Sequence, residues 1–183
     1  MSRTPPSATA LRVADLSTTT DNAFAYRPDA ATLEKISADL KLNALRKLSF
    51  EGLIRPMGKT DWQLEARLGA TAVQSCVVTL DPVTTRIDTD VTRRFLADYS
   101  DPDDPEVEMP EDDTTEALGV WIDPFDIMLE ALTLALPDYP RKDEAALGPM
   151  VYTKPGKAPM TDEDAKPFAG LADLRAALGK DKD

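Results

Sequence analysis

The residue types that most often carry enzyme chemistry are scarce in this 183-residue sequence. It contains no histidine, which is the commonest general base, the usual partner of a catalytic nucleophile and the commonest metal ligand. Its one cysteine, Cys76, cannot form an internal disulfide, and a single thiolate is too few for a structural zinc site. We therefore expect no catalytic residues, no metal, no cofactor and no small-molecule substrate.

The segment Gly52–Thr60, GLIRPMGKT, is similar to a phosphate-binding loop, whose backbone amides cradle phosphates while a lysine reaches them. Five residues separate its two glycines where the pattern has four, and alternating residues rather than a helical pattern follow Lys59. A phosphate-binding loop joins a strand to a helix. The sequence therefore favours a hairpin turn.

Cys76 lies in the segment QSCVVTLDPV. A reactive thiol has a pKa lowered by a nearby base, cation or helix N-terminus, and the neighbouring residues supply none of these. Free cysteines are among the most buried residue types in proteins. We therefore expect a small, partly buried residue in a strand or turn.

The net charge of −12 is unevenly distributed. No Lys or Arg occurs between Phe95 and Pro140, so the rest of the chain carries a small positive charge. Residues 99–119 are expected to form a long acidic surface loop, because blocks of like charge are usually solvated. Calcium binding is disfavoured, since the EF-hand spacing is missing. A second interpretation is docking on a basic partner through Asp101, Asp103, Asp104, Glu106 and Glu108.

Three runs of alternating apolar and polar residues, at 45–54, 60–72 and 83–95, predict strands. The short turns between them, at 55–59 and 80–83, favour an antiparallel meander. Helical spacing predicts helices at 29–42, 123–136 and 168–178. A short strand is expected at 11–13 and a connection at 21–28. The fold class is α+β, an antiparallel β-sheet packed by two or three helices.

The same patterns divide the chain into three parts. We expect a flexible N-terminal tail at 1–9, an α+β domain at 10–140, and an extended segment with a short helix at 141–183. No apolar run approaches the roughly 20 residues that cross a bilayer. The N-terminus does not look like a signal peptide. These features predict a cytoplasmic protein without a membrane partner.

Basic residues on the predicted strands are candidates for contact with RNA. They are Arg46, Lys47, Arg67, Arg86 and Arg94. Acidic residues lie among them, and an ordinary mixed surface is the competing interpretation. The sequence leaves both open.

Three segments, in order, resemble the YceD family. SCVVTLDPV at 75–83 is similar to a family segment that often carries Cys-x-x-Cys, with Thr79 here in place of the second cysteine; this form resembles alphaproteobacterial members. WIDPFDIMLEALTLALPDYP at 121–140 resembles a helix followed by Leu-Pro-x-x-Pro. KPFAGLADLRAAL at 166–178 is similar to the family's C-terminal ending. The matching motif residues are Cys76, Leu80, Pro82, Asp123, Leu136, Pro137, Pro140 and Phe168.

The resemblance implies a non-enzymatic role in the accumulation or processing of 23S ribosomal RNA and in large-subunit assembly. The implied partner is ribosomal RNA or a ribosomal protein. Many members carry further cysteines after Leu-Pro-x-x-Pro, and residues 141–148 contain none. A metal-binding role therefore does not carry over. The alternative is a general interaction module that docks its acidic segment on a basic partner without contacting RNA.

Overall fold

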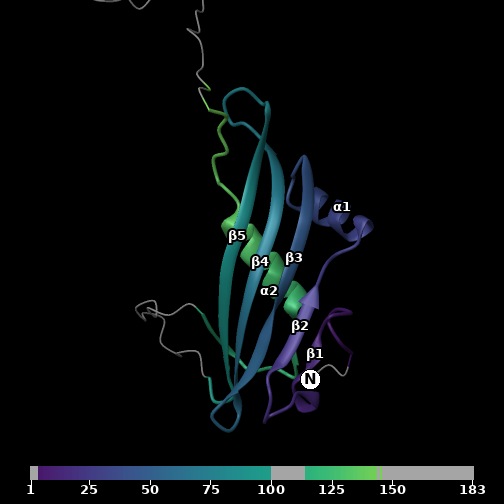
Figure 1. Ribbon diagram of the computed structural model, residues 1–183, viewed down its shortest axis with the longest axis vertical. Coiled ribbons are helices and arrows are strands. Elements are labelled where there is room, and N and C mark those ends of the chain that lie inside the picture. Colours follow the sequence, from purple (N-terminus) through teal and green to yellow (C-terminus); the bar gives the residue numbers. More distant parts are fainter. Residues whose placement is uncertain (1–3, 100–113, 144, 146–183) are drawn as a thin grey trace, which may run out of the picture. The chain divides into compact units, whose positions relative to one another are not determined.

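The structure is a computed structural model that describes residues 4–99, 114–143 and 145. All its elements lie within Met1–Glu144. A five-stranded sheet has the order β2-β3-β4-β5-β6, and a two-stranded sheet pairs β1 with β7 (Figure 1). The strands are β1 Leu11–Arg12, β2 Asn22–Tyr26, β3 Ala44–Met57, β4 Asp61–Ser75, β5 Pro82–Leu96, β6 Thr115–Ala117 and β7 Trp121–Ile122.

The central meander of β3, β4 and β5 is confirmed, and its strands are longer than the sequence predicted. β3 and β4 pair antiparallel to the end of the hairpin, where Met57 lies opposite Asp61. Gly58 in the turn has a φ of 69°, which glycine adopts without steric cost. Because a strand rather than a helix follows Lys59, the GLIRPMGKT segment is a hairpin and not a phosphate-binding loop.

Three strands, β2, β6 and β7, were not predicted. β2 occupies residues expected to be a connection, and the alternation in NAFAY is too short and too weakly apolar to signal a strand. β6 lies within the stretch expected to be a loop and pairs parallel to β5, so the sheet is mixed rather than purely antiparallel. A short edge strand with an acidic side chain carries almost no hydrophobic signal.

Both described α-helices begin and end at local signals in the sequence, and a short 3-10 helix covers Val13–Asp15. α1, Ala30–Asp39, is capped by Asp29, whose side chain accepts from Thr32 N–H. It ends in a Schellman motif, with Lys41 at a φ of 53° and Leu42 N–H donating to Ser37 C=O. α2, Pro124–Ala135, is capped by Asp123 and begins with proline at its first turn. The helix predicted at 168–178 lies outside the described residues.

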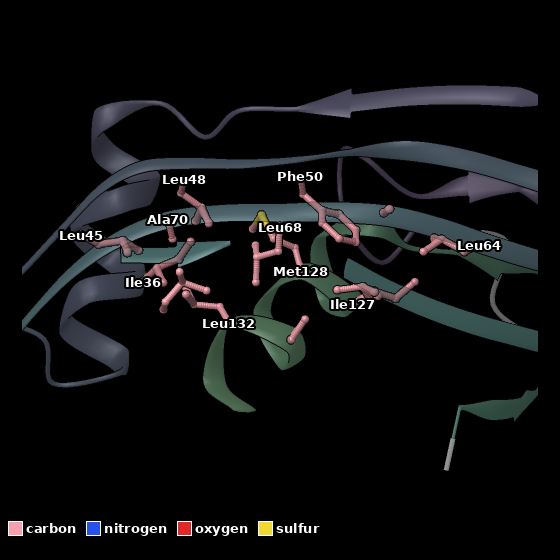
Figure 2. Close-up of a cluster of buried hydrophobic side chains, with 14 of the residues drawn as sticks. Ile36, Leu45, Leu48, Phe50, Leu64, Leu68, Ala70, Ile127, Met128 and Leu132 are labelled. Atoms are coloured by element: carbon pink, nitrogen blue, oxygen red, sulfur yellow. The ribbon is translucent and has the colours of Figure 1, made fainter. Parts of the chain in front are cut away.

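The hydrophobic core lies between one face of the large sheet and the two helices (Figure 2). Seven large side chains from the predicted strands and from the predicted helix at 123–136 are buried in it: Phe50, Trp62, Leu64, Val91, Phe95, Met128 and Leu132. Phe125 is only partly buried, and its ring meets Tyr26 edge-on with the centroids 6.0 Å apart. The opposite face of the sheet carries charged side chains.

Among the described residues no helix is both long and apolar enough to cross a membrane.

Candidate functional site

The turn between β4 and β5 brings together residues from two motifs that are distant in the sequence. It runs from Cys76 to Asp81, and Cys76 N–H donates to Asp81 C=O at 2.7 Å. Val77 N–H donates to Pro140 C=O at 2.9 Å, and Gln74 Nε2 donates to Pro137 C=O at 3.2 Å. These hydrogen bonds hold the Cys76 turn, residues 76–81, against the Leu-Pro-x-x-Pro segment, residues 136–140, which follows α2.

The Cys76 thiol is fully buried at this junction, where the sequence predicted a partly buried residue. It accepts hydrogen bonds from the Thr79 hydroxyl and from the backbone N–H groups of Thr79, Val78 and Lys142. These bonds, with that from the Thr79 hydroxyl the strongest, lower the pKa of Cys76 from 9.0 to about 6. The expectation that nothing nearby lowers this pKa was wrong.

The donors to Cys76 were missed because most of them are backbone amides, which no sequence pattern shows. Lys142 reaches the sulfur only because the chain after α2 returns to the turn, and its ammonium also pairs with Asp81 at 3.2 Å. The hydroxyl of Thr79 is the side-chain donor to the sulfur. Among the described residues no group of His, Cys, Asp and Glu could hold a metal ion.

The remaining motif residues of the described chain shape the ends of elements. Leu80 has a φ of 63° and is 76% exposed, while Pro82 begins β5 opposite Ser75. Leu136 ends α2, and Pro140 is buried beneath the Cys76 turn. Phe168 lies outside the described residues, and so do Asp101, Asp103, Asp104, Glu106 and Glu108.

Asp123 fastens the N-terminal segment to the start of α2. Its Oδ1 accepts from Ser7 Oγ at 2.8 Å, from Thr9 Oγ1 at 2.9 Å and from Phe125 N–H at 2.9 Å. Its Oδ2 is buried without a hydrogen-bond partner among the described residues. Ser7 and Thr9 belong to the segment expected to be a tail, and here they complete the cap.

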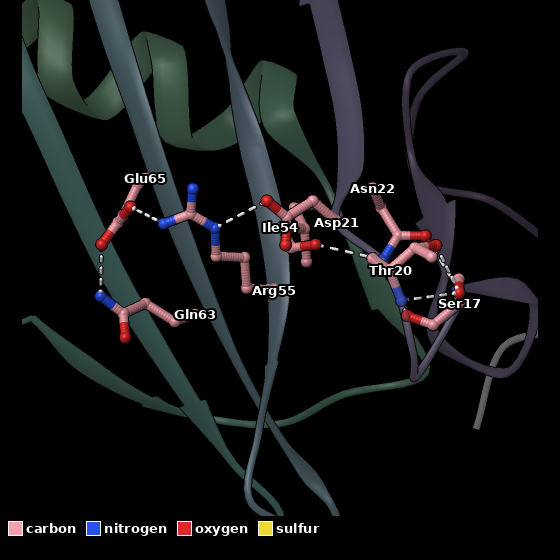
Figure 3. A network of polar contacts seen from close by, with 8 residues as sticks. All are labelled: Ser17, Thr20, Asp21, Asn22, Ile54, Arg55, Gln63 and Glu65. Atoms are coloured by element: carbon pink, nitrogen blue, oxygen red, sulfur yellow. Dashed lines mark hydrogen bonds and ion pairs between the residues drawn. The ribbon is translucent and has the colours of Figure 1, made fainter.

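The outer face of the sheet carries the candidate RNA-facing arginines together with carboxylates, and several of these groups form ion pairs. Arg55 bridges Glu65 at 2.6 Å and Asp21 at 3.1 Å (Figure 3). Arg86 binds Asp88 through two hydrogen bonds of 2.6 and 2.7 Å, which hold the pKa of Asp88 below its usual value. The arginines of this face are Arg27, Arg46, Arg55, Arg67, Arg86 and Arg94, and its carboxylates are Asp21, Glu51, Asp61, Glu65, Asp88 and Asp90.

The balance of positive and negative side chains determines whether the outer face can attract a polyanion such as RNA. Arg67 lies 3.9 Å from Asp90, an ion pair weakened by its exposure. Arg46 and Lys47 have no ion pair among the described residues, and Lys47 lies at a bulge in β3 with a φ of 52°. Six arginines interspersed with six carboxylates give little electrostatic attraction for a polyanion. The arrangement matches the mixed surface that the sequence analysis left open.

Arg93 joins β5, β6 and α2 on the core side of the sheet, a role that no sequence pattern indicated. It pairs with Glu130 of α2 at 2.6 Å and with Glu116 of β6 at 3.3 Å, while its own side chain is only 12% exposed. Burial, opposed by the charge of Arg93, raises the pKa of Glu116. The cluster holds the short strand β6 and the helix against β5.

Comparison with known proteins gives one family. The model of the family described as Large ribosomal RNA subunit accumulation protein YceD matches residues 64–175, which is more than half of the chain. No curated protein matches the chain, and no solved structure does. The matched range begins in β4 and includes both the Cys76 turn and the Leu-Pro-x-x-Pro segment that contacts it. The chain therefore belongs to the YceD family, whose description names the accumulation of the large ribosomal RNA subunit.

Proposed function

We propose that this chain supports the accumulation of 23S ribosomal RNA and the assembly of the large ribosomal subunit as a non-enzymatic factor that binds a basic protein. Family membership supports the ribosomal role. The absence of histidine and the complete burial of Cys76 support a role without catalysis, because the thiol in the described part of the chain is neither accessible nor next to a histidine base.

The choice of a protein partner over RNA rests on the pairing of arginines on the outer sheet face. Single-stranded RNA binds proteins through cations that replace its counterions and through aromatic rings on which bases stack. Here Arg55 and Arg86 are held in short ion pairs with carboxylates. Contact with RNA would have to break these pairs, so a partner with its own cations fits the chain better.

Depletion of the protein tests the ribosomal role. We expect the ratio of 23S to 16S ribosomal RNA to fall and the large-subunit peak in a sucrose gradient to shrink. An unchanged ratio of 23S to 16S ribosomal RNA, with normal subunit profiles, would refute the proposed ribosomal role.

A pull-down of the full chain with and without nuclease tests the nature of the partner. Partners that are retained after RNase digestion support protein binding. Partners lost on digestion favour RNA, and variants Arg46→Gln and Lys47→Gln then show whether the unpaired cations of β3 carry it.

A further inference from the structure

Two arginines and a threonine lie in one row across β3, β4 and β5, which run side by side (Figure 1). Arg46 is the register partner of Thr71, and Thr71 is the partner of Arg86. Because neighbouring strands are about 4.8 Å apart, the two arginine Cα atoms are separated by about 10 Å, and both side chains are long enough to meet above Thr71. Arg86 Nη1 donates to Thr71 Oγ1 at 3.4 Å. The threonine hydroxyl keeps its own hydrogen as a donor.

A bulge in β3 adds a third cation at the same end of the sheet. The register between β3 and β4 shifts between Arg46 and Ser49. Leu45 and Leu48 are buried, yet both residues between them, Arg46 and Lys47, are exposed. In a regular strand one of two consecutive side chains would face the core. Lys47 has a φ of 52°, which is strained for any residue except glycine. The bulge therefore presents two adjacent basic side chains to solvent.

The local charge at this end of the outer face is positive. Asp88 is the one carboxylate in the two flanking rows, and Arg86 holds it through hydrogen bonds of 2.6 and 2.7 Å. Arg46 and Lys47 have no ion pair among the described residues. Three cations against one anion leave two positive charges. The flanking rows are Ser49, Gly69 and Asp88 on one side and Ala44, Val73 and Thr84 on the other.

A compact dianion matches this arrangement better than a long polyanion. A nucleic-acid backbone that followed the strands would meet Glu51 and Asp90, which share a row two steps away. A phosphomonoester carries about two negative charges at neutral pH and presents three acceptor oxygens. Guanidinium groups bind such oxygens with a forked pair of N–H groups, and an ammonium binds them as a point charge.

We propose that Arg46, Lys47 and Thr71, beside the fixed charge of Arg86, bind one phosphate group. Arg46 supplies the forked contact, Lys47 the second charge and Thr71 a hydroxyl donor. Free inorganic phosphate and the 5′-phosphate at the end of an RNA strand offer the same chemistry. The inference goes beyond the proposed function and does not depend on a basic protein partner.

Titration of the full chain with inorganic phosphate, followed by NMR, tests the site. The amide signals of Arg46, Lys47 and Thr71 and the side-chain N–H signal of Arg46 should shift and saturate. Two charge-assisted contacts predict a dissociation constant of about 1 mM. Sodium acetate and sodium chloride at the same ionic strength are the controls and should give no saturating shift. A phosphate titration without saturation at these residues, or an equal response to acetate, would overturn the proposal.

A matched pair of arginine variants locates the contact. Arg46→Gln should weaken phosphate binding by about tenfold, because it removes a charge-assisted hydrogen bond. Arg27→Gln removes another exposed arginine, which pairs with Glu51 at 3.4 Å, and should leave binding unchanged. Equal weakening by both variants would mean that only the overall charge of the protein matters, which would refute a local site.

Lys47→Gly separates the charge of Lys47 from the shape of the bulge. Glycine adopts a φ of 52° without strain, so this variant should unfold at the same temperature as the wild type or at a higher one. It should nevertheless bind phosphate more weakly, because one of the two unpaired cations is lost. A Lys47→Gly protein that binds phosphate as tightly as the wild type would exclude Lys47 from the site.

Two RNA oligomers of one sequence, with a 5′-phosphate and with a 5′-hydroxyl, identify the source of the phosphate. Displacement of inorganic phosphate by the phosphorylated oligomer alone would support an RNA end as the ligand. Displacement by neither oligomer would support free phosphate. Equal displacement by both would show that the chain binds the RNA backbone and would overturn a site for one phosphate group. Depletion in cells decides the ribosomal role separately, because the titration needs no partner.

Discussion

Val77 N–H donates to the carbonyl oxygen of Pro140 at 2.9 Å, and this bond closes the chain after α2 onto the β4–β5 turn. It holds Lys142 N–H within 3.5 Å of the Cys76 sulfur. Because the thiolate is stabilised by this contact and by Thr79, the packing of the two motif segments is coupled to the ionisation of one side chain.

We expect Cys76 to stabilise the fold more strongly as the pH rises from about 6 to 9.0. The pKa of the thiol is about 6 in the folded chain and 9.0 in a free thiol, so the folded value is depressed. The contribution of the thiolate is therefore fully present above pH 9.0 and is lost as the pH falls through about 6. Urea unfolding of the wild type and Cys76→Ser should show a difference in free energy of unfolding that grows with pH across this window.

Thr79→Val provides the control, because it removes the hydroxyl that lowers the pKa most and keeps the shape of the side chain. Ultraviolet titration of the thiolate in this variant should give a pKa above that of the wild type. A stability difference between the wild type and Cys76→Ser that stays constant over the window would contradict the assignment.

Arg93 should matter far more for stability than the exposed arginines. Arg93→Gln leaves Glu116 and Glu130 without their common partner and is expected to lower the free energy of unfolding by about 1–3 kcal/mol. Arg27→Gln is the control, since that side chain is 74% exposed and its pair with Glu51 is worth less than about 1 kcal/mol. Equal losses in the two variants, measured by urea unfolding, would refute a special role for Arg93.

The sequence predicted those parts of the fold whose signal is local. The strict alternation of Trp62, Leu64 and Ala66 placed β4, and the Asp123-Pro124 pair placed the start of α2. Features that depend on partners elsewhere could not be read in this way. Arg93 looks like any other arginine on a strand, and only the fold brings Glu116 and Glu130 to it.

The same limit applies to the candidate site. The motif residue Cys76 was recognisable, but its depressed pKa depends on the local turn that aims the Thr79 hydroxyl at the sulfur and on the distant Lys142 N–H that the fold brings to it. The arginines of the outer face were identified correctly as members of strands. Their pairing with Asp88 or Glu65 depends on register and rotamer, which composition does not specify.

Gly52 is expected to tolerate no side chain. A Cβ at this position would collide with the Glu65 carbonyl oxygen and with the backbone of Ala66 on the adjacent strand. Gly52→Ala should therefore force β3 and β4 apart and cost about 3 kcal/mol or more. Gly119→Ala, where a Cβ meets nothing closer than 3.6 Å, should change stability by less than about 1 kcal/mol. Thermal unfolding of the two variants checks the contrast, and a stable Gly52→Ala protein would show that the sheet can adjust.

Asp123 should be required for the start of α2 and for the attachment of the N-terminal segment. Asp123→Ala removes the acceptor of Ser7, Thr9 and Phe125 N–H, and we expect a loss of about 1–2 kcal/mol in the free energy of unfolding. Asp123→Asn keeps one carbonyl oxygen in the cap and should lose less. Thr9→Ala tests the attachment alone: amide exchange near Ala10 should accelerate while α2 stays protected. A Thr9→Ala variant that destabilises α2 as much as Asp123→Ala would mean that the cap and the N-terminal segment act as one unit.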